Sequence, residues 1–291
     1  MTLSETTAVL TNDEGRPVHV DVRRPGGGGD PGGPSLPVVV VLHGFKGFKD
    51  WGMFPPTARR IAERGFAVVS LNASRNGVGD PDRPEEFTDL EGFAHKTPQR
   101  EIDDVRLVLR AIASGELGDG MDAARIGLLG HSRGGGVMGL VAAAEPGIRA
   151  LVLWAAVSTF QRYTPRAVAA WREKGRMDVP NARTGQLMWL DRAVLEDLER
   201  NRDAYDLETA LARVRAPTLV IHGERDEAVS VTDAENLYAW AAAERKELLL
   251  IPKTGHTFGA AHPWNGGSPA WERAVEATAA WFEDTLRGPN G

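Results

Sequence analysis

The sequence predicts an α/β protein whose central sheet is mostly parallel and is flanked by helices. Short apolar runs recur along the 291 residues, and segments with apolar residues at helical spacing separate them. Several runs are continuous stretches of Val, Ile and Leu, which is typical of strands covered on both faces. Ligands of such sheets bind beyond the carboxyl ends of the strands, so the loops there are expected to carry the chemistry.

The first third of the chain begins with two short strands and continues with buried ones. Strands at 6–10 and 18–22 flank a turn at 12–15, where Asn, Asp and Gly favour a chain reversal. A Gly/Pro-rich loop at 24–37 follows, and we do not expect it to bind phosphate, because no lysine and no helix start come after it. The other elements predicted here are strands at 38–42 and 66–71 and a helix at 56–64.

A long polar loop precedes the central elements. Residues 72–97 are polar, with many Asp and Glu from 80 to 91, and a loop of this length is typical of a lid or of the edge of a site. The helix predicted after it has Thr97 as its N-cap and Pro98 at its first position. The central elements are helices at 98–114 and 137–144 and strands at 125–130 and 150–154.

Residues 158–201 interrupt the alternation of strands and helices. They have a helical pattern and many Arg and Trp residues, so we interpret them as a small helical cap inserted into a single domain that spans 1–291. The alternation then resumes. The elements predicted after the insertion are helices at 207–214, 231–243 and 269–286 and strands at 218–222 and 247–251.

A serine between glycines follows the strand at 125–130. Gly130-His-Ser-Arg-Gly134 matches the pattern Gly-x-Ser-x-Gly and joins a predicted strand to a predicted helix. In that context the motif is typical of the strained turn that exposes a nucleophilic serine, here Ser132, and an ordinary turn serine is the alternative. A serine hydroxyl is a weak nucleophile, so it requires a neighbouring base and a group that orients this base.

Two other strand ends supply candidates for these roles. His256 follows the strand at 247–251 and is the predicted base, because a neutral imidazole can accept a proton. Asp226 follows the strand at 218–222 and is the predicted group that orients His256. The order serine, aspartate, histidine is the one expected with this motif. The weaker candidates are His262 as the base and Glu224, Glu227 or Asp233 as the carboxylate.

Backbone donors are required where negative charge develops on a substrate oxygen. We expect the N–H group of Arg133, at a helix start, and that of Phe45, in the loop after the strand at 38–42, to form this oxyanion hole. The charged side chains of Arg133 and Lys46 either steer an anionic substrate or serve structure and solvation. The remaining strand-end histidines, which are expected to be packing residues, are His43, His131 and His222.

Taken together, these motifs resemble those of the α/β-hydrolases. The resemblance covers residues 38–286, and within the superfamily the chain is similar to dienelactone-hydrolase-like proteins, feruloyl esterases and serine aminopeptidase-like hydrolases. It implies the α/β-hydrolase fold, a Ser132, Asp226 and His256 triad, ester or amide substrates, and no metal or cofactor. True dienelactone hydrolases use a cysteine nucleophile, whereas this chain has Ser132. The motifs that carry the resemblance are His43-Gly44, Gly130-His-Ser-Arg-Gly134, His222-Gly-Glu-Arg-Asp226 and Gly255-His-Thr-Phe258.

The leading functional hypothesis is a carboxylesterase that cleaves small to medium carboxylic esters through an acyl-enzyme on Ser132. The alternative is a serine aminopeptidase or amidase, which requires a carboxylate to hold a substrate ammonium; the acidic run at 80–91 could supply one. A non-catalytic ligand-binding member of the fold is the third hypothesis. The aromatic residues that either line the substrate pocket or belong to the core are Trp154, Phe160, Trp171 and Trp189.

Composition narrows the kinds of chemistry, partner and cellular location that are expected for this protein. The chain has no cysteine, which excludes disulfides, thiolate catalysis and cysteine-ligated metals. A net charge of −6 and a pI near 5.7 disfavour nucleic acid and anionic membranes as partners. Neither a signal-peptide pattern nor a membrane-spanning run is visible, so we expect a cytoplasmic protein. The expected partner is a small-molecule ester, and homo-oligomer formation stays open.

Overall fold

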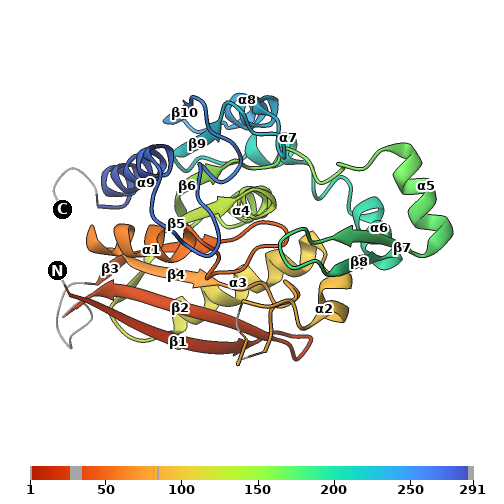
Figure 1. Ribbon diagram of the computed structural model, residues 1–291. Coiled ribbons are helices and arrows are strands. Elements are labelled where there is room, and N and C mark those ends of the chain that lie inside the picture. Colours follow the sequence, from red (N-terminus) through yellow and green to blue (C-terminus); the bar gives the residue numbers. More distant parts are fainter. Residues whose placement is uncertain (1, 27–34, 81, 84, 288–291) are drawn as a thin grey trace.

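The computed structural model describes residues 2–26, 35–80, 82–83 and 85–287, and it has the predicted α/β architecture (Figure 1). Eight strands form one sheet, and two others form a separate hairpin. The strands are β1 (Leu3–Thr11), β2 (Pro17–Pro25), β3 (Leu36–Leu42), β4 (Ala67–Leu71), β5 (Met121–His131), β6 (Ile148–Trp154), β7 (Arg176–Pro180), β8 (Leu187–Asp191), β9 (Thr218–Gly223) and β10 (Lys246–Ile251). The helices are α1 (Phe54–Glu63), α2 (Leu90–Ala94), α3 (Pro98–Ser114), α4 (Arg133–Ala144), α5 (Pro165–Lys174), α6 (Arg192–Arg200), α7 (Leu207–Leu211), α8 (Val231–Trp240) and α9 (Pro269–Phe282), with a π-helical turn at Glu283–Arg287.

The large sheet is antiparallel at one edge and parallel in the rest. Its strand order is β1-β2-β4-β3-β5-β6-β9-β10. β2 pairs antiparallel with β1 and with β4, and every pair from β4 to β10 is parallel. Leu42 at the end of β3 lies opposite Gly130 of β5. The loop after β3 therefore emerges beside the turn that carries Ser132.

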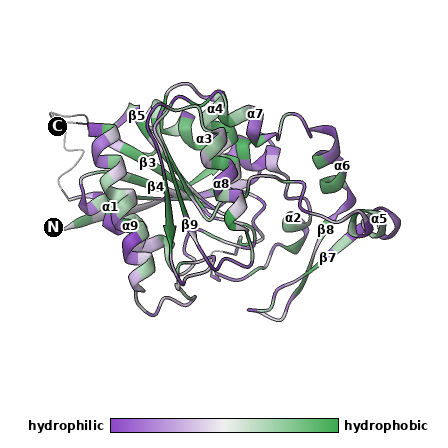
Figure 2. Cartoon of the chain, turned by 90° about the horizontal axis from the view of Figure 1, so that it is seen from above, coloured by the Kyte–Doolittle hydropathy of each residue, from purple (hydrophilic) through white to green (hydrophobic). Residues whose placement is uncertain are grey.

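Helices cover both faces of this sheet (Figure 2). α1 and α9 pack on one face, and α3, α4, α7 and α8 pack on the other. β3 shows why both faces are covered, because Val38, Val40 and Leu42 belong to one core and Val39 and Val41 to the other. Full burial of one such side chain contributes about 1.5–3 kcal/mol to folding. The continuous apolar run in β3 thus stabilises both layers at once.

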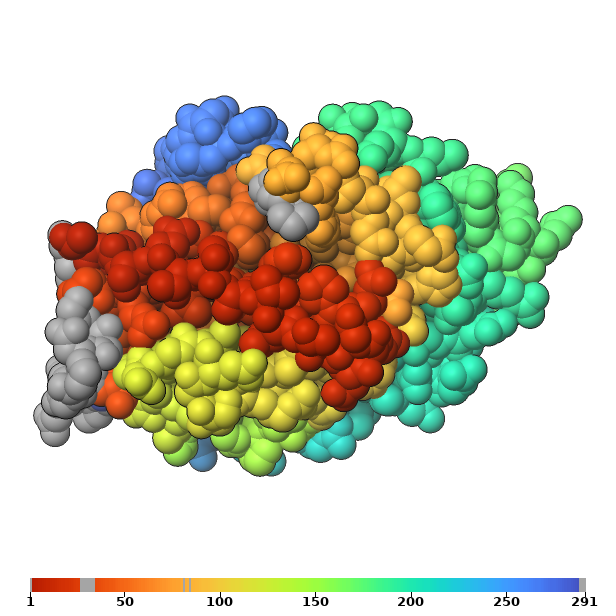
Figure 3. Space-filling model, turned by 90° about the horizontal axis from the view of Figure 1, so that it is seen from below, coloured from red at the N-terminus to blue at the C-terminus, as the bar shows by residue number. Residues whose placement is uncertain are grey.

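The inserted segment at 158–201 lies at the end of the molecule toward which the parallel strands run (Figure 1), and it is the green region at one end of Figure 3, away from the red β1 and β2. It contains the helices α5 and α6, as predicted, and also the hairpin β7–β8, which was not predicted. In β8, Met188 and Leu190 are buried and Leu187 is exposed. Four apolar residues in succession hide this period-two pattern, which explains why a wholly helical cap was predicted.

Other element boundaries differ from the prediction in specific places. α4 begins at Arg133 and not at residue 137, because Gly134, Gly135 and Gly136 continue the helix without side chains that would reveal its period. The polar loop at 72–97 contains the short helix α2, capped by Asp89. Residues 27–34 of the Gly/Pro-rich loop lie outside the described residues. Within the described part of the chain, no helix is long and apolar enough to cross a membrane.

Candidate active site

Ser132 occupies the sharp turn between β5 and α4. Its backbone has φ 57° and ψ −122°, a left-handed conformation that an L-residue adopts only when the surroundings hold it there. The Ser132 N–H donates to the carbonyl of Trp154 at 2.8 Å. A Cβ on Gly134 would lie 2.3 Å from the carbonyl oxygen of His43, so only glycine allows α4 to approach the end of β3 so closely. The motif therefore produces the strained turn that the sequence predicts.

His256 and Asp226 converge on Ser132 from the ends of β10 and β9. Nε2 of His256 lies 3.0 Å from Oγ of Ser132, and Nδ1 of His256 lies 2.8 Å from Oδ2 of Asp226. The imidazole is partly exposed, whereas the Asp226 side chain is fully buried. An ionised carboxylate only accepts, so Nδ1–H of His256 donates to Asp226 and Nε2 is left to accept from the Ser132 hydroxyl. The structure thus brings the three predicted side chains together.

The Asp226 carboxylate is held by four donors. Oδ1 accepts from the backbone N–H groups of Ala228 and Val229 at 2.8 and 2.9 Å, and Oδ2 accepts from His256 and from Nε2 of His222, which is 3.3 Å away. Burial alone would raise the pKa of Asp226, but the hydrogen bonds from His222, His256 and Val229 outweigh burial and hold this pKa well below its usual range. The carboxylate is therefore ionised and fixed in direction.

Two histidines that were expected to be packing residues hold the predicted base and its partner. His222 is fully buried and its Nε2–H also donates to the carbonyl of Val229 at 3.0 Å. His131 donates from Nε2 to the carbonyl of His256 at 2.9 Å, and the two rings lie 4.7 Å apart. Burial lowers the pKa of His131 to about 3, so this ring is neutral. Their positions, one beside Ser132 and one at the end of β9, are the only sequence signal that could have indicated these contacts.

The loop after β3 lies directly against the serine. A Cβ on Gly44 would lie 2.9 Å from Cβ of Ser132, so this loop needs glycine at the point of contact. His43 fixes the loop, since its Nδ1–H donates to the Gly44 carbonyl at 2.9 Å and its Nε2 accepts from the N–H of Ala73 at 3.3 Å. Burial lowers the pKa of His43 to about 3, which keeps it in this neutral form. Phe45 follows in the same loop, and Arg133 is the first residue of α4.

Two hollows open beside Ser132, one on each side. The first has a volume of about 360 Å³ and the second about 300 Å³, and both are lined by Phe45, Lys46, Ser132 and His256. The first hollow lies toward α4 and the start of the insertion, and its other lining residues are Arg133, Val157, Thr159, Phe160, Arg162, Tyr163, Ala228 and Val229. The second lies under the tip of the β7–β8 hairpin, and its other lining residues are Gly44, Gly47, Trp51, Phe54, His131, Asn181, Ala182, Arg183 and Thr257.

Of the four aromatic residues considered as pocket walls, only Phe160 lines a hollow that contains Ser132. Trp154 is a core residue whose indole N–H donates to Thr278 of α9 at 2.8 Å. Trp171 is buried in α5 behind Tyr163, with the rings 5.2 Å apart. Trp189 on β8 lies under the guanidinium of Arg176. These three tryptophans therefore stabilise the core and the insertion.

The weaker candidates lie apart from the serine or have other partners. His262 pairs with Glu85 at 2.9 Å, and its Nδ1 accepts from the N–H of Gly52. Asp233 accepts from Ser158 and pairs with Arg162. Glu224 and Glu227 are exposed. Among the described residues, no group of three or more His, Asp or Glu side chains is placed to hold a metal ion.

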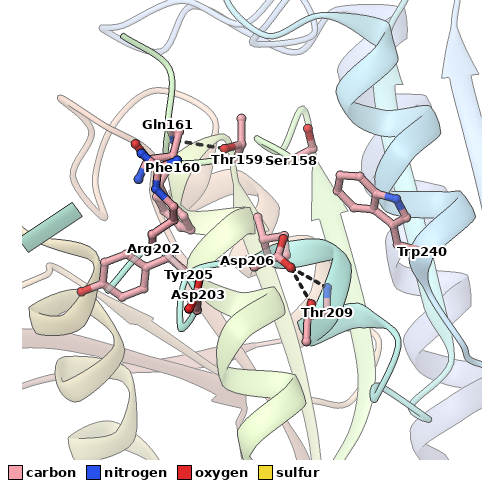
Figure 4. A pocket seen from close by; sticks show the side chains of 11 residues that line it. Ser158, Thr159, Phe160, Gln161, Arg202, Asp203, Tyr205, Asp206, Thr209 and Trp240 are labelled. Carbon is pink, nitrogen blue, oxygen red and sulfur yellow. Dashed lines mark hydrogen bonds between the residues drawn. The ribbon is translucent and has the colours of Figure 1, made fainter. Parts of the chain in front are cut away.

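The largest hollow described is separate from the serine. It measures about 540 Å³ and is lined by residues 158–161, by residues between 202 and 209, and by Trp240 of α8 (Figure 4). The Asp206 carboxylate accepts from Thr209 within it, which caps α7 and makes this wall structural. Phe160 is common to this hollow and to the first hollow beside Ser132, and Ser132 itself is not part of it.

Comparison with known proteins identifies the family to which the sequence is similar. The sequence model described as the prolyl oligopeptidase family matches residues 53–288, well over half of the chain. This range contains Ser132, Asp226 and His256, and it begins after the loop that carries Phe45. A curated relative, an uncharacterized peptidase YuxL of Bacillus subtilis, is 26% identical over 262 residues, which cover 88% of this chain but only 35% of that protein. The chain thus spans about a third of the length of this relative.

Solved structures share the fold over nearly the whole chain. The enzyme Est1E of Butyrivibrio proteoclasticus, solved with bound ferulic acid, has a TM-score of 0.70 at 18% identity, covering 96% of this chain and 99% of its own. An acetyl xylan esterase of Paenibacillus sp. R4 has a TM-score of 0.65 at 22% identity, covering 98% and 84%. Identities this low carry information about the fold alone, and they confirm the predicted α/β-hydrolase fold.

Proposed function

Because the chain belongs to the prolyl oligopeptidase family, whose members are serine hydrolases of the α/β-hydrolase superfamily, we propose that it is a carboxylesterase that cleaves small to medium carboxylic esters through an acyl-enzyme on Ser132. The observation that carries this proposal is the hydrogen-bonded line from Ser132 through His256 to the buried Asp226, with separations of 3.0 and 2.8 Å. A serine activated in this way attacks acyl carbonyl groups.

In the proposed reaction, Oγ of Ser132 attacks the ester carbonyl while Nε2 of His256 takes the hydroxyl proton. The imidazolium that forms is stabilised by the ionised Asp226, which stays unprotonated throughout. His256 then returns the proton to the leaving alcohol, and the acyl group remains bonded to Ser132. A water that loses a proton to His256 attacks this acyl-enzyme and releases the carboxylic acid, which restores the free serine.

The charge on the tetrahedral intermediate requires donors that are in place before the reaction. We assign this role to the backbone N–H of Arg133, at the start of α4 where the helix dipole favours a negative charge, and to that of Phe45. Gly44 allows the second donor to approach, because the loop touches Ser132 there. Loss of one such donor typically costs about 3–4 kcal/mol of transition-state stabilisation.

A peptidase is the second candidate, since the family and the curated relative are both named for peptidases. An aminopeptidase needs a carboxylate that holds the substrate ammonium. The acidic run at 80–91 does not favour this, because none of its residues lines either hollow beside Ser132. Several of its carboxylates also pair within the chain, among them Asp80 with Arg83, Glu85 with His262, and Asp89 with Arg16. The non-catalytic hypothesis is disfavoured because all three triad positions carry reactive side chains.

Turnover of 4-nitrophenyl acetate and butyrate by the wild-type protein and by Ser132→Ala tests the proposal. We expect the wild type to hydrolyse both esters and the variant to lose this activity, and equal rates would overturn the proposal. Aminoacyl 4-nitroanilides measured in parallel separate an esterase from an aminopeptidase, which would cleave the anilides faster. Labelling of Ser132 by a fluorophosphonate separates both enzymes from a binding protein, which would stay unlabelled.

A further inference from the structure

The side chains that line the first hollow beside Ser132 carry positive charge and no negative charge. Three basic side chains line it, and they are Lys46, Arg133 and Arg162. No carboxylate is among its lining residues. Asp233 neutralises Arg162 from outside the hollow at 3.1 Å. The charges of Lys46 and Arg133 are therefore the ones that a ligand in the hollow meets.

Among the described residues, Arg133 has one carboxylate partner, and it shares this partner with a second cation. Nε of Arg133 donates to Oε2 of Glu101 at 2.6 Å, and Oε1 of the same Glu101 lies 2.9 Å from Nζ of Lys96. Glu101 and Lys96 are each only 1% exposed, and the Arg133 side chain is 11% exposed. The next carboxylate, that of Asp104, accepts from Asn12 and from the backbone N–H of Ser74, and it also attracts Lys96 electrostatically. Arg133 therefore shares Glu101 with Lys96, whereas Lys96 also lies near a second carboxylate.

The protonation of this cluster follows from the same geometry. Burial would raise the pKa of Glu101, but Arg133 and Lys96 hold it below its usual range, so the carboxylate is ionised. Burial lowers the pKa of Lys96, as expected for a cation whose counter-charge is shared. An anion bound beside Arg133 would add negative charge next to a guanidinium whose carboxylate partner is shared.

The guanidinium of Arg133 also has donors to spare. Its Nε donates to Glu101 and its Nη2 is buried without a hydrogen-bond partner among the described residues, so Nη1 is the nitrogen left to face a ligand in the hollow. The guanidinium lies 5.5 Å above the ring of Phe160, which fixes its plane at the wall of the hollow. A planar guanidinium with free N–H groups is the arrangement that recognises a carboxylate. Phe45, Phe160, Tyr163 and Val157 supply the apolar wall for the rest of such a ligand.

From this arrangement we infer that the substrate carries a carboxylate in addition to its ester bond, and that Arg133, assisted by Lys46, binds this carboxylate in the first hollow. The inference rests on the proposed esterase function of Ser132. The class of substrate is a half-ester of a dicarboxylic acid or an ester of a carboxylate-bearing alcohol. A free amino terminus would meet like charges in this hollow, which also argues against an aminopeptidase.

Two matched pairs of esters test the inference from both sides of the scissile bond. On the acyl side, mono(4-nitrophenyl) glutarate is compared with neutral 4-nitrophenyl valerate. On the alcohol side, 4-acetoxybenzoate is compared with its methyl ester. We expect kcat/KM to be about tenfold or more higher for the charged member of one pair, as charged hydrogen bonds provide. The ratio should fall as salt is raised.

Variants of Arg133 and Lys46 test whether these residues cause the preference for the charged ester. Arg133→Met keeps the backbone N–H of residue 133, and it should bring the ratio of charged to neutral ester close to one. Lys46→Met should lower the same ratio. It replaces Arg133→Met as the test if circular dichroism shows that Arg133→Met does not fold. Arg192→Met is the matched control, because it removes a positive charge from an exposed ion pair on α6, and it should leave the ratio unchanged.

Each outcome has a distinct meaning. If the wild type hydrolyses the neutral esters without preferring either charged one, the inference is overturned and the proposed esterase function stands. If the preference exists but Arg133→Met and Lys46→Met both retain it, the assigned residues are wrong. If no ester is hydrolysed and a fluorophosphonate does not label Ser132, the proposed function itself fails.

Discussion

Two buried carboxylates near Ser132 have opposite surroundings. Asp226 accepts from two backbone N–H groups and from two imidazoles, so its neighbours are neutral donors that all point at it. Glu101 is shared by two basic groups, Lys96 and Arg133. Neutral donors fix the direction of a carboxylate and leave its charge available to the imidazole of His256. Because Arg133 shares its carboxylate with Lys96, it is less fully compensated than in a pair of its own, and it lines the first hollow, where a ligand can meet it.

Asp226→Asn breaks the first arrangement and has the largest expected effect. An amide at this position would hold the imidazole of His256 in the wrong tautomer, and kcat should fall by about 10⁴ while folding is retained. The measurement is kcat on 4-nitrophenyl butyrate, with circular dichroism as the folding check. Glu227→Gln, which alters an exposed neighbour, is the matched control. A kcat near the wild-type value would mean that another carboxylate orients His256.

Glu101→Gln breaks the second arrangement. It removes the carboxylate that Lys96 and Arg133 share in the interior, so the free energy of unfolding should fall by about 3–5 kcal/mol. Urea denaturation at pH 7 measures this loss. Glu272→Gln is the comparison, because its partner Arg60 is 47% exposed, and an exposed pair contributes at most about 1 kcal/mol. Equal losses of unfolding free energy in the two variants would show that Lys96 and Arg133 do not depend on Glu101 for their compensation.

Acid pH should destabilise the folded chain through the two buried histidines of the site. The pKa values of His43 and His131 are about 3 in the folded chain and near 6.5 in an unfolded one. The unfolded chain therefore binds more protons between these values, so stability is complete above pH 6.5 and is lost as the pH falls toward 3. At pH 5 each histidine should cost about 2 kcal/mol. Urea denaturation at pH 7 and pH 5 tests this, and identical stabilities would contradict it.

His131→Phe is expected to have the smallest effect. Phenylalanine fills the same space beside Phe54 but cannot donate to the carbonyl of His256, so that the base is less well positioned. Loss of one hydrogen bond of this kind costs about 1 kcal/mol, and kcat should fall by up to about tenfold with little change in KM. The variant should also lose less stability between pH 7 and pH 5 than the wild type. A loss as large as in the wild type would mean that other groups cause the acid sensitivity.

The sequence predicted the fold and the meeting of Ser132, Asp226 and His256, because each rests on a local pattern. Apolar runs in the strands, glycines around Ser132 and the positions of Asp226 and His256 after their strands are all readable along the chain. The parallel order of the strands then places these loops at one edge of the sheet. Their catalytic roles stay a proposal that the kinetic tests above address.

Features that depend on contacts between distant segments could not be predicted. Nothing in the spacing shows that Lys96, Glu101 and Arg133 form one cluster, since the loop before α3 must fold against the start of α4. The sequence left Trp154 and Trp171 as either pocket walls or core residues, and only the contacts between distant segments show that both are buried in the core. The β7–β8 hairpin was missed because consecutive apolar residues carry no readable period.

One consequence follows from the two hollows that meet at Ser132. Under the proposed esterase reaction, a substrate that occupies both is divided at its carbonyl carbon, with one half in each hollow. Departure of the alcohol half then empties one side of the serine while the acyl half still fills the other. The emptied hollow is where we expect the water that completes turnover to enter.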